Sequence, residues 1–327
     1  MMTRNELSDL LDSFEARRIL VVGDVMLDEY VWGQVNRISP EAPVMVVEVT
    51  STDWRLGGAG NVANNVQAMG GRCVVCGVVG DDPNGAVVQT QVAAIGADAS
   101  GLVSAKDRPT TVKTRIVAHS QQVVRVDRET RAPVSGEVLE RMAAFVRNAL
   151  PMVDAVVLSD YAKGALTEDH VREIVALARQ HSKPVAANLK PPRVAPFHGA
   201  TFLTLNVHEA ERASNSSIPD EATLLTVGAE LRAQMDCDGL LVTRGPNGVA
   251  LFTADEAPLL LSARPVEVYD VAGAGDAVIS AATMALASGA TFAQAAAIGN
   301  LAGNAKVTKL GVAPVTREEM LRLAGPS

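Results

Sequence analysis

The first apolar segment of the chain reads Ile19-Leu20-Val21-Val22, and Gly23-Asp24 follows it directly. A short apolar run of this kind, ended by a glycine and a carboxylate, is typical of a strand that is buried on both faces. Similar runs recur at residues 74–79, 155–158, 184–187, 201–205 and 240–243, most of them just before a helical pattern. Buried strands that alternate with helices predict an α/β fold with a mostly parallel central sheet covered on both faces.

Two other segments, residues 30–49 and 110–126, alternate apolar and polar residues and are more polar overall. They predict a small β-rich excursion from the core. Such a sheet could cover a site as a lid or pair with a second subunit, and the sequence leaves both roles open. The length allows one large α/β core or two modest ones, and we expect a single domain over residues 1–327, without repeats or low-complexity tails.

Composition argues against several classes of function. The chain has 327 residues, 48% of them hydrophobic, and a net charge of −8, which disfavours nucleic acid as a partner. Charges near the N-terminus replace the apolar core of a secretory signal, so we expect a cytoplasmic protein. Polar residues interrupt the Ala-rich stretch 281–305, which predicts a core helix pair instead of a membrane span.

Cys73 and Cys76 form a C-x-x-C spacing that could indicate redox or zinc chemistry. They lie in a predicted buried strand, where residues three apart point to opposite faces. We therefore interpret both as structural. His208, which has no matching histidine, is interpreted as a surface residue and not as a zinc ligand.

The strongest local signal is the run Gly273-Ala274-Gly275-Asp276 before an Ala-rich helical pattern at 277–287. Small residues let backbone N–H groups converge at a helix N-terminus, which predicts an anion site for a transferring phosphoryl group. Asp276 at the same terminus could accept the proton of an attacking alcohol. By itself, the pattern fits an N-cap aspartate after a glycine turn equally well.

A second glycine turn, Gly57-Gly58, precedes a helical pattern that carries Asn61 and either Asn64 or Asn65. The glycines allow close approach of a ligand, and the amides could bind sugar hydroxyls from one helix face. No G-x-G-x-x-G follows a strand here and no G-x-x-x-x-G-K-[ST] occurs, so neither a dinucleotide fold nor a P-loop is supported.

Polar residues also follow the other predicted strands. Asp24 and Asp28 suit polyhydroxy ligands, and Lys163 and Lys190 could offset phosphate charge, although each has an ordinary structural alternative. Asn206 and Glu209, three apart on a helix, could hold Mg²⁺ directly or through water. Glu209 fits a helix-start carboxylate equally well.

Together these motifs resemble the ribokinase-like, pfkB-type carbohydrate kinases, from about residue 18 to 314. The family carries a Gly-Gly-Asn sugar motif, an N-x-x-E motif and a late D-[TV]-x-G-A-G-D signature, which match residues 57–61, 206–209 and 270–276. Residues 22–28, 37–44 and 158–164 look like the D-glycero-D-manno-heptose 7-phosphate kinases of ADP-heptose and lipopolysaccharide synthesis. Many of those are fused to a nucleotidyltransferase domain, and the end at Ser327 predicts the stand-alone form.

The resemblance implies a three-layer α/β sandwich with a β-rich lid, a homodimer, and ATP and Mg²⁺ as cofactors. Asp276 would be the base, acting on the anomeric hydroxyl, with Gly273, Ala274 and Gly275 as the anion hole. The remaining implied contacts are grouped by ligand: for ATP, Asn206, Glu209, Thr243, Gly245, Gly248, Asn300 and Asn304; for the sugar phosphate, Asp24, Asp28, Gly57, Gly58, Asn61, Lys163 and Lys190.

Four positions depart from the family pattern. Ala272 and Ala277 replace residues that carry a hydroxyl group in the family. A hydroxyl near the anion hole, or a monovalent cation beside it, is therefore missing here. The resemblance to the family still allows a monovalent cation as a cofactor. Asn188 replaces the aspartate of D-P-K, and Leu205 replaces the proline of T-P-N. The loss of a carboxylate at 188 puts one substrate contact in doubt.

Three functions remain open on the sequence: the heptose 7-phosphate kinase, a kinase of the same family for another sugar or sugar phosphate, and a non-catalytic sugar-phosphate sensor. Without a substrate phosphate, Lys163 and Lys190 would lack partners, which favours a phosphorylated sugar. Retention of Asp276 favours an enzyme, since binding alone needs no base.

Overall fold

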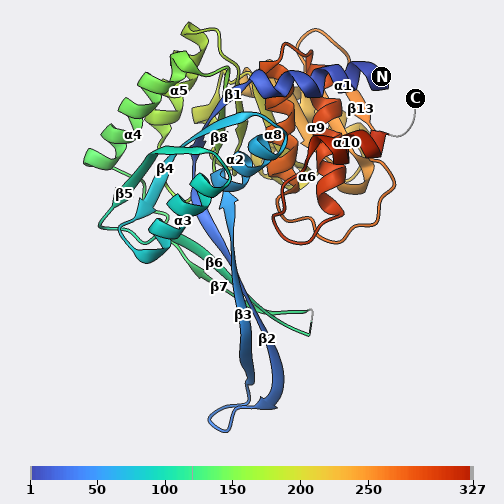
Figure 1. The fold of residues 1–327 in the computed structure, drawn as a ribbon. Coiled ribbons are helices and arrows are strands. Elements are labelled where there is room, and N and C mark those ends of the chain that lie inside the picture. Colours follow the sequence, from blue (N-terminus) through green and yellow to red (C-terminus); the bar gives the residue numbers. More distant parts are fainter. Residues whose placement is uncertain (1, 120, 325–327) are drawn as a thin grey trace.

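The computed structural model describes residues 2–119 and 121–324. Position 120, inside the second predicted β-rich segment, therefore lies outside the described residues. Within the described ranges, the centre of the molecule is a nine-stranded sheet (Figure 1). Its strands follow the order β13 (Leu259–Leu261), β12 (Val249–Thr253), β11 (Gly239–Thr243), β10 (Phe202–Asn206), β9 (Val185–Asn188), β8 (Ala155–Ser159), β1 (Arg18–Gly23), β4 (Arg72–Gly80) and β5 (Asp98–Ala105).

Every strand from β11 to β5 in that order is parallel to its neighbour, and β12 and β13 extend one edge in antiparallel fashion. All six apolar segments of the sequence lie in the parallel part, so the predicted parallel sheet is confirmed. The chain leaves β1 in one direction to β4 and later returns on its other side to β8. Ligands of parallel α/β sheets bind at such a reversal, beyond the carboxyl ends of the strands.

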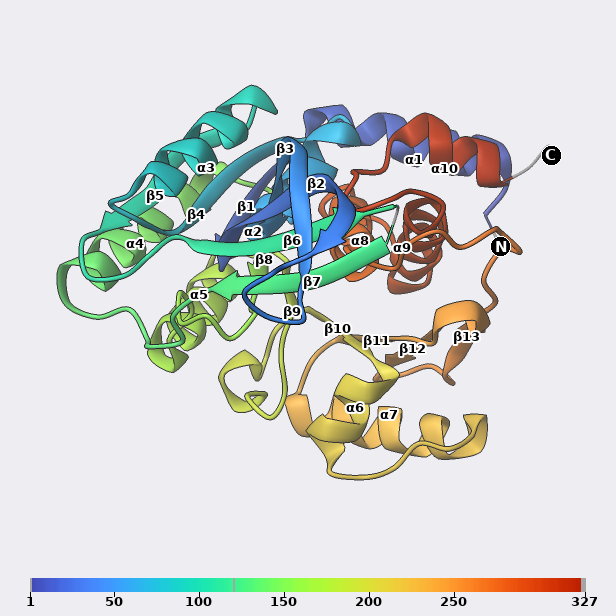
Figure 2. The same ribbon diagram turned by 90° about the horizontal axis from the view of Figure 1, so that it is seen from below.

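Helices cover both faces of the sheet and complete the predicted three layers (Figure 2). Along β1, Ile19 and Val21 pack into one hydrophobic cluster and Leu20 and Val22 into the other. The first face carries α1 (Arg4–Asp12), α2 (Ala59–Ala68), α3 (Pro83–Ala94), α8 (Ala274–Ala287), α9 (Phe292–Val307) and α10 (Arg317–Ala324). The second carries α4 (Gly136–Ala149), α5 (Glu168–Gln180), α6 (Val207–Ser214) and α7 (Glu221–Met235).

Two structural interpretations of the sequence are confirmed by this layering. Cys73 and Cys76 pack into different hydrophobic clusters on opposite faces of β4. Burial raises the pKa of both thiols, that of Cys76 to about 12, so neither is a ready thiolate. The Ala-rich stretch 281–305 forms the packed pair α8 and α9, and α9 begins with a capping box of Thr291 and Gln294.

No helix of the described residues combines the length and the apolar character needed to cross a bilayer.

Local capping explains where two of the other helices begin. The side chain of Thr167 accepts from the backbone of His170 at the start of α5, and Asp82 does the same for Gly85 at α3.

The second sheet contains β3 (Met45–Gly58), β2 (Val25–Ile38), β6 (Thr111–Ala118) and β7 (Gln121–Arg128), in that order. It is larger than the predicted segments 30–49 and 110–126. The difference arises at its base, where Val25, Leu27 and Leu56 are buried in the main core and continue the strands into the body. The far ends of β2 and β3 project away from the body (Figure 1).

The two faces of this small sheet differ in chemistry. Strand register places Asp28, Tyr30, Arg55, Lys113, Arg115 and Asp127 on one face. This charged face looks toward the body, since Arg55 donates to the carbonyl oxygen of Leu310 at 3.2 Å. The opposite face carries Val31, Trp54, Ile116, Val124 and Val126, and the last two are 46% and 53% exposed.

Candidate active site

The candidate site lies at the carboxyl ends of β1, β8 and β9, where the N-terminus of α8 packs against the sheet. The polar residues that follow these strands come together here because neighbouring parallel strands end at the same edge. They are Asp24 after β1, Tyr161 after β8, and Asn188 and Lys190 at the end of β9.

Asp276 is the centre of this arrangement. It lies in the first turn of α8 and is 2% exposed. Its Oδ2 accepts a hydrogen bond from Asn61 Nδ2 at 2.7 Å, and its Oδ1 accepts one from the Tyr161 hydroxyl at 2.6 Å. Burial raises the pKa of Asp276 to about 6 despite these two bonds. The carboxylate is therefore ionised at neutral pH and basic enough to accept a proton.

The glycine turn before α8 leads directly into the helical turn that carries Asp276, and its role as an anion site stays a prediction. Gly273 is the N-cap residue in a left-handed conformation with φ 78°. A Cβ at this position would lie 2.7 Å from Asn61 Nδ2, so a side chain would push that amide away from Asp276. The N–H of Ala274 donates to the carbonyl oxygen of Val271 at 3.2 Å, which commits one of the three predicted donors.

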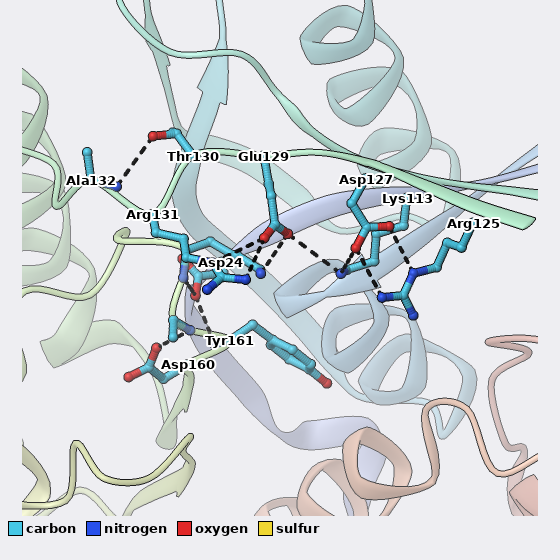
Figure 3. A network of polar contacts seen from close by, with 12 residues as sticks. Asp24, Lys113, Arg125, Asp127, Glu129, Thr130, Arg131, Ala132, Asp160 and Tyr161 are labelled. Carbon is cyan, nitrogen blue, oxygen red and sulfur yellow. Dashed lines mark hydrogen bonds and ion pairs between the residues drawn. The ribbon is translucent and has the colours of Figure 1, made fainter.

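The carboxylates of Asp24 and Asp28 both have partners within the protein, and their contact with a sugar stays a prediction. Asp24 accepts backbone N–H bonds from Tyr161, Lys163 and Ala165 at 2.8–3.0 Å. It thereby shapes the turn that aims Tyr161 at Asp276. Figure 3 shows Asp24 beside Tyr161. Asp28 forms an ion pair with Arg115 on the small sheet.

Both predicted phosphate-binding lysines have carboxylate partners. Lys163 lies 2.6 Å from Glu129, and Lys190 pairs with Glu209. Glu129 also meets Arg131 at 3.2 Å and Lys113 at 3.7 Å (Figure 3). The sequence argument that these lysines lack partners without a substrate phosphate is therefore wrong, because folding brings to them Glu129, which follows β7, and Glu209, which lies in the first turn of α6.

Asn206 and Glu209 form a capping box at the start of α6, each side chain accepting from the other's backbone N–H at 2.9 Å. The other oxygen of Glu209 accepts from Lys190. Direct coordination of Mg²⁺ by this pair would require these contacts to rearrange, and binding through water stays a prediction. Among residues 2–119 and 121–324, no group of three or more His, Cys, Asp or Glu side chains is placed to hold a metal ion.

The predicted adenine-side residues Asn300 and Asn304 line a cavity of about 1160 Å³ between α1, α9 and the segment after β13, and Asp276 is not among its lining residues. Asn300 donates to the carbonyl oxygen of Ser262 at 2.9 Å, and Asn304 to that of Asn300 at 2.6 Å. Thr243, Gly245 and Gly248 form the turn between β11 and β12. A Cβ on Gly248 would lie 2.0 Å from the carbonyl oxygen of Leu261, so this turn packs against β13.

The glycines of the second turn serve the protein's own packing. A Cβ on Gly57 would lie 2.6 Å from Asp28 Oδ2, and one on Gly58 2.2 Å from the carbonyl oxygen of Asp24. Asn65 is also structural, since it donates to the carbonyl of Asn61 and accepts from the N–H of Val315. His208 has a 91% exposed side chain, as its surface interpretation predicts.

Sequence reasoning missed three contributors to the site: Tyr161, Glu129 and Arg115. Tyr161 lies two residues before Lys163 in the segment 158–164, and its position after a parallel strand was the available signal. Glu129 lies just beyond the predicted segment 110–126, and nothing local distinguishes it from a solvent-exposed glutamate.

Comparisons with known proteins find similar sequences over nearly the whole chain. The chain is 41% identical to the bifunctional protein HldE of Desulfatibacillum aliphaticivorans over 320 residues, which cover 98% of this chain and 65% of that protein. It thus spans slightly less than two thirds of that relative. The HldE protein of Geobacter metallireducens is also 41% identical, over 99% of this chain and 66% of its own.

Two solved structures share the fold. Arabidopsis thaliana ribokinase, complexed with ribose and ATP, has a TM-score of 0.75 and 19% identity, covering 95% of this chain and 100% of its own. Escherichia coli phosphofructokinase-2, in complex with potassium, has a TM-score of 0.79 and 16% identity, covering 94% and 98%. These likenesses show the ribokinase-like fold. The model of the pfkB family carbohydrate kinases matches residues 16–319, and so the chain belongs to that family of sugar kinases.

Proposed function

We propose that this kinase transfers the γ-phosphoryl group of ATP to the anomeric hydroxyl of D-glycero-D-manno-heptose 7-phosphate. The products would be heptose 1,7-bisphosphate and ADP, for ADP-heptose and lipopolysaccharide synthesis in the cytoplasm. The observation that carries the reaction type is the buried Asp276 carboxylate at the N-terminus of α8, held by Tyr161 and Asn61. The sugar is supported by residues 37–44 and 158–164, which resemble heptose 7-phosphate kinases, and by the HldE relatives.

In this proposal Asp276 accepts the proton of the sugar hydroxyl as its oxygen attacks the γ-phosphorus. The first-turn N–H groups of α8 have no carbonyl four residues earlier within the helix and favour the negative charge that develops there. The N–H groups of Gly273 and Gly275 remain our candidates for the anion hole. ATP and Mg²⁺ would approach from the side of Asn206, Glu209 and the turn at Thr243, and the bound Mg²⁺ would offset phosphate charge.

The charged face of the small sheet supports an anionic substrate. Glu129 is surrounded by Lys113, Lys163 and Arg131, and the neighbouring Asp127 pairs with Lys113 and Arg125. Four cations therefore face two carboxylates, which leaves a surplus of positive charge beside the site. A sugar phosphate could take the place of Glu129 on Lys163, whereas a neutral sugar would leave that ion pair intact.

We also propose a homodimer formed through the outer face of the small sheet. The side chains Trp54, Val124 and Val126 on this face are 41%, 46% and 53% exposed. Glu29 and Thr114 lie on the same face, and the side chains of Trp54 and Thr114 both donate to Glu29. A second copy of the same sheet would therefore cover exposed apolar side chains together with this polar group.

The first experiment is an ADP-release assay with Mg-ATP and a panel of acceptors: heptose 7-phosphate, fructose 6-phosphate, ribose, adenosine and 2-keto-3-deoxygluconate. We expect selective turnover of heptose 7-phosphate. Lys163→Ala should raise the KM for this substrate at least ~10-fold, through loss of a charge-assisted contact. Lys183→Ala is the matched control, because Lys183 precedes the amino end of β9, whereas the site lies at the carboxyl ends of the strands.

Two outcomes would redirect the proposal. Turnover of another acceptor alone would retain the kinase and discard the heptose pathway. No turnover by any acceptor would favour the sugar-phosphate sensor. Where an acceptor is turned over, Asp276→Asn tests whether Asp276 is the base, and full activity of the variant would show that it is not. In an enzyme this variant binds ATP and sugar phosphate yet turns over at least ~100-fold more slowly.

A further inference from the structure

Lys306, in the last turn of α9, has a side chain that is 0% exposed. No other lysine or arginine of the described residues is buried to this degree. Removing an ammonium group from water is costly unless oxygen atoms of the protein replace its hydration. The contacts of Lys306 should therefore indicate what this charge does.

The ammonium of Lys306 lies between two backbone segments. Its Nζ donates to the carbonyl oxygen of Asp270 at 3.4 Å and to that of Lys309 at 3.3 Å. Asp270 begins the glycine turn that leads to Asp276, and Lys309 lies in the turn that follows α9. The ammonium thus connects the approach to the anion site with the end of the neighbouring helix.

The Asp270 carboxylate strengthens the same junction. Its Oδ1 accepts from the N–H of Ala272 at 2.9 Å and its Oδ2 from the N–H of Gly311 at 2.8 Å. The N–H of Tyr269 also donates to the carbonyl oxygen of Val307 at 2.8 Å. The charges of Asp270 and Asp276 both favour the protonated form of Lys306 and oppose the effect of burial, which lowers its pKa.

Carbonyl oxygens that converge beside an anion site are the ligands expected for a hard monovalent cation. The family resemblance did not decide whether a monovalent cation binds near Ala272. The carbonyls of Asp270 and Lys309 do not fit an added ion here, because they already accept from Lys306. A lysine ammonium is a compact point charge and can replace a small cation at such a place.

We propose that the Lys306 ammonium is a built-in cation that substitutes for a monovalent metal ion: it holds the turn 270–273 in place for the anion site and makes the kinase independent of K⁺. The inference rests on phosphoryl transfer at α8, not on the identity of the sugar. Lys306 is a positioning residue, since it acts through the backbone of the turn.

The test compares wild type, Lys306→Ala and the control Lys183→Ala in choline chloride and in KCl or NH₄Cl, using whichever sugar the panel identifies. Wild type and control should change less than ~2-fold between salts. Lys306→Ala should lose at least ~100-fold in kcat in choline, as expected when an oxyanion site is disordered. It should recover at least ~10-fold in K⁺ or NH₄⁺, because the vacated space admits an ion, and a purely structural role would not give this rescue.

Thermal unfolding supplies a readout that needs no sugar. K⁺ should raise the Tm of Lys306→Ala relative to choline and leave that of wild type unchanged, because only the variant has a site for the ion. Activation of wild type by K⁺ of more than ~10-fold would overturn the proposal, even if Lys306→Ala did not fold. Full activity of Lys306→Ala in choline would overturn it as well. Failure of every sugar in the panel would affect only the proposed substrate, since the unfolding comparison would still stand.

Discussion

At the scale of single residues, the basicity of Asp276 depends on two neighbours. Burial raises its pKa to about 6, and the bonds from Tyr161 and Asn61 oppose that rise by favouring the carboxylate. We expect kcat/KM to fall as the pH drops below about 6, because the base becomes protonated. Tyr161→Phe removes one stabilising bond, so the acid limb should move to higher pH, with a ~10-fold loss of kcat at neutral pH.

A pH–rate profile of wild type and Tyr161→Phe measures this shift. Tyr269→Phe is the control, because its hydroxyl bonds to Glu267 on the surface at 3.0 Å. An acid limb that stays at the same pH in Tyr161→Phe would show that the Tyr161 bond does not influence the base.

At the scale of the element, α8 has a left-handed glycine at each end, and only one of them touches the site. Gly273 has φ 78° and Gly289 has φ 85°. Replacing either glycine by alanine should lower the free energy of unfolding by about 1 kcal/mol through backbone strain. Gly273→Ala should also displace Asn61 and reduce kcat at least ~10-fold, whereas a Cβ at Gly289 meets no heavy atom within 4 Å.

Urea unfolding and the ADP-release assay, run on both variants, separate strain from catalysis. Similar stability losses with unequal kcat values are expected. If both variants kept wild-type kcat, the contact between the glycine turn and Asn61 would not matter for turnover.

At the scale of the whole molecule, the exposed apolar side chains on the outer face of the small sheet should decide the oligomeric state. Sedimentation is expected to give about twice the 34.2 kDa of one chain. Val126→Lys places a charge on this face and should shift the protein to monomers. Met152 is 61% exposed and lies just before β8, a strand of the main sheet. The variant Met152→Lys should therefore remain dimeric. A monomeric wild type would rule out this interface.

The sequence by itself determined the parts of this protein that depend on neighbouring residues. Apolar runs such as residues 19–22 specify buried strands, and the glycine turn before an Ala-rich helix places Asp276 at a helix N-terminus. The larger extent of the small sheet was missed, because the base of β2 and β3 is apolar and reads as core.

Only the tertiary structure decided which charges and donors meet. Asn61 and Tyr161 reach Asp276 from 215 and 115 residues away. Glu129 and Glu209 form ion pairs with the lysines that the sequence assigned to a phosphate. Asp24 accepts hydrogen bonds from three backbone N–H groups, and Lys306 is buried between two turns. A side chain bonds to the partner that folding brings within hydrogen-bond reach, and no local pattern specifies that partner, because it comes from another part of the chain.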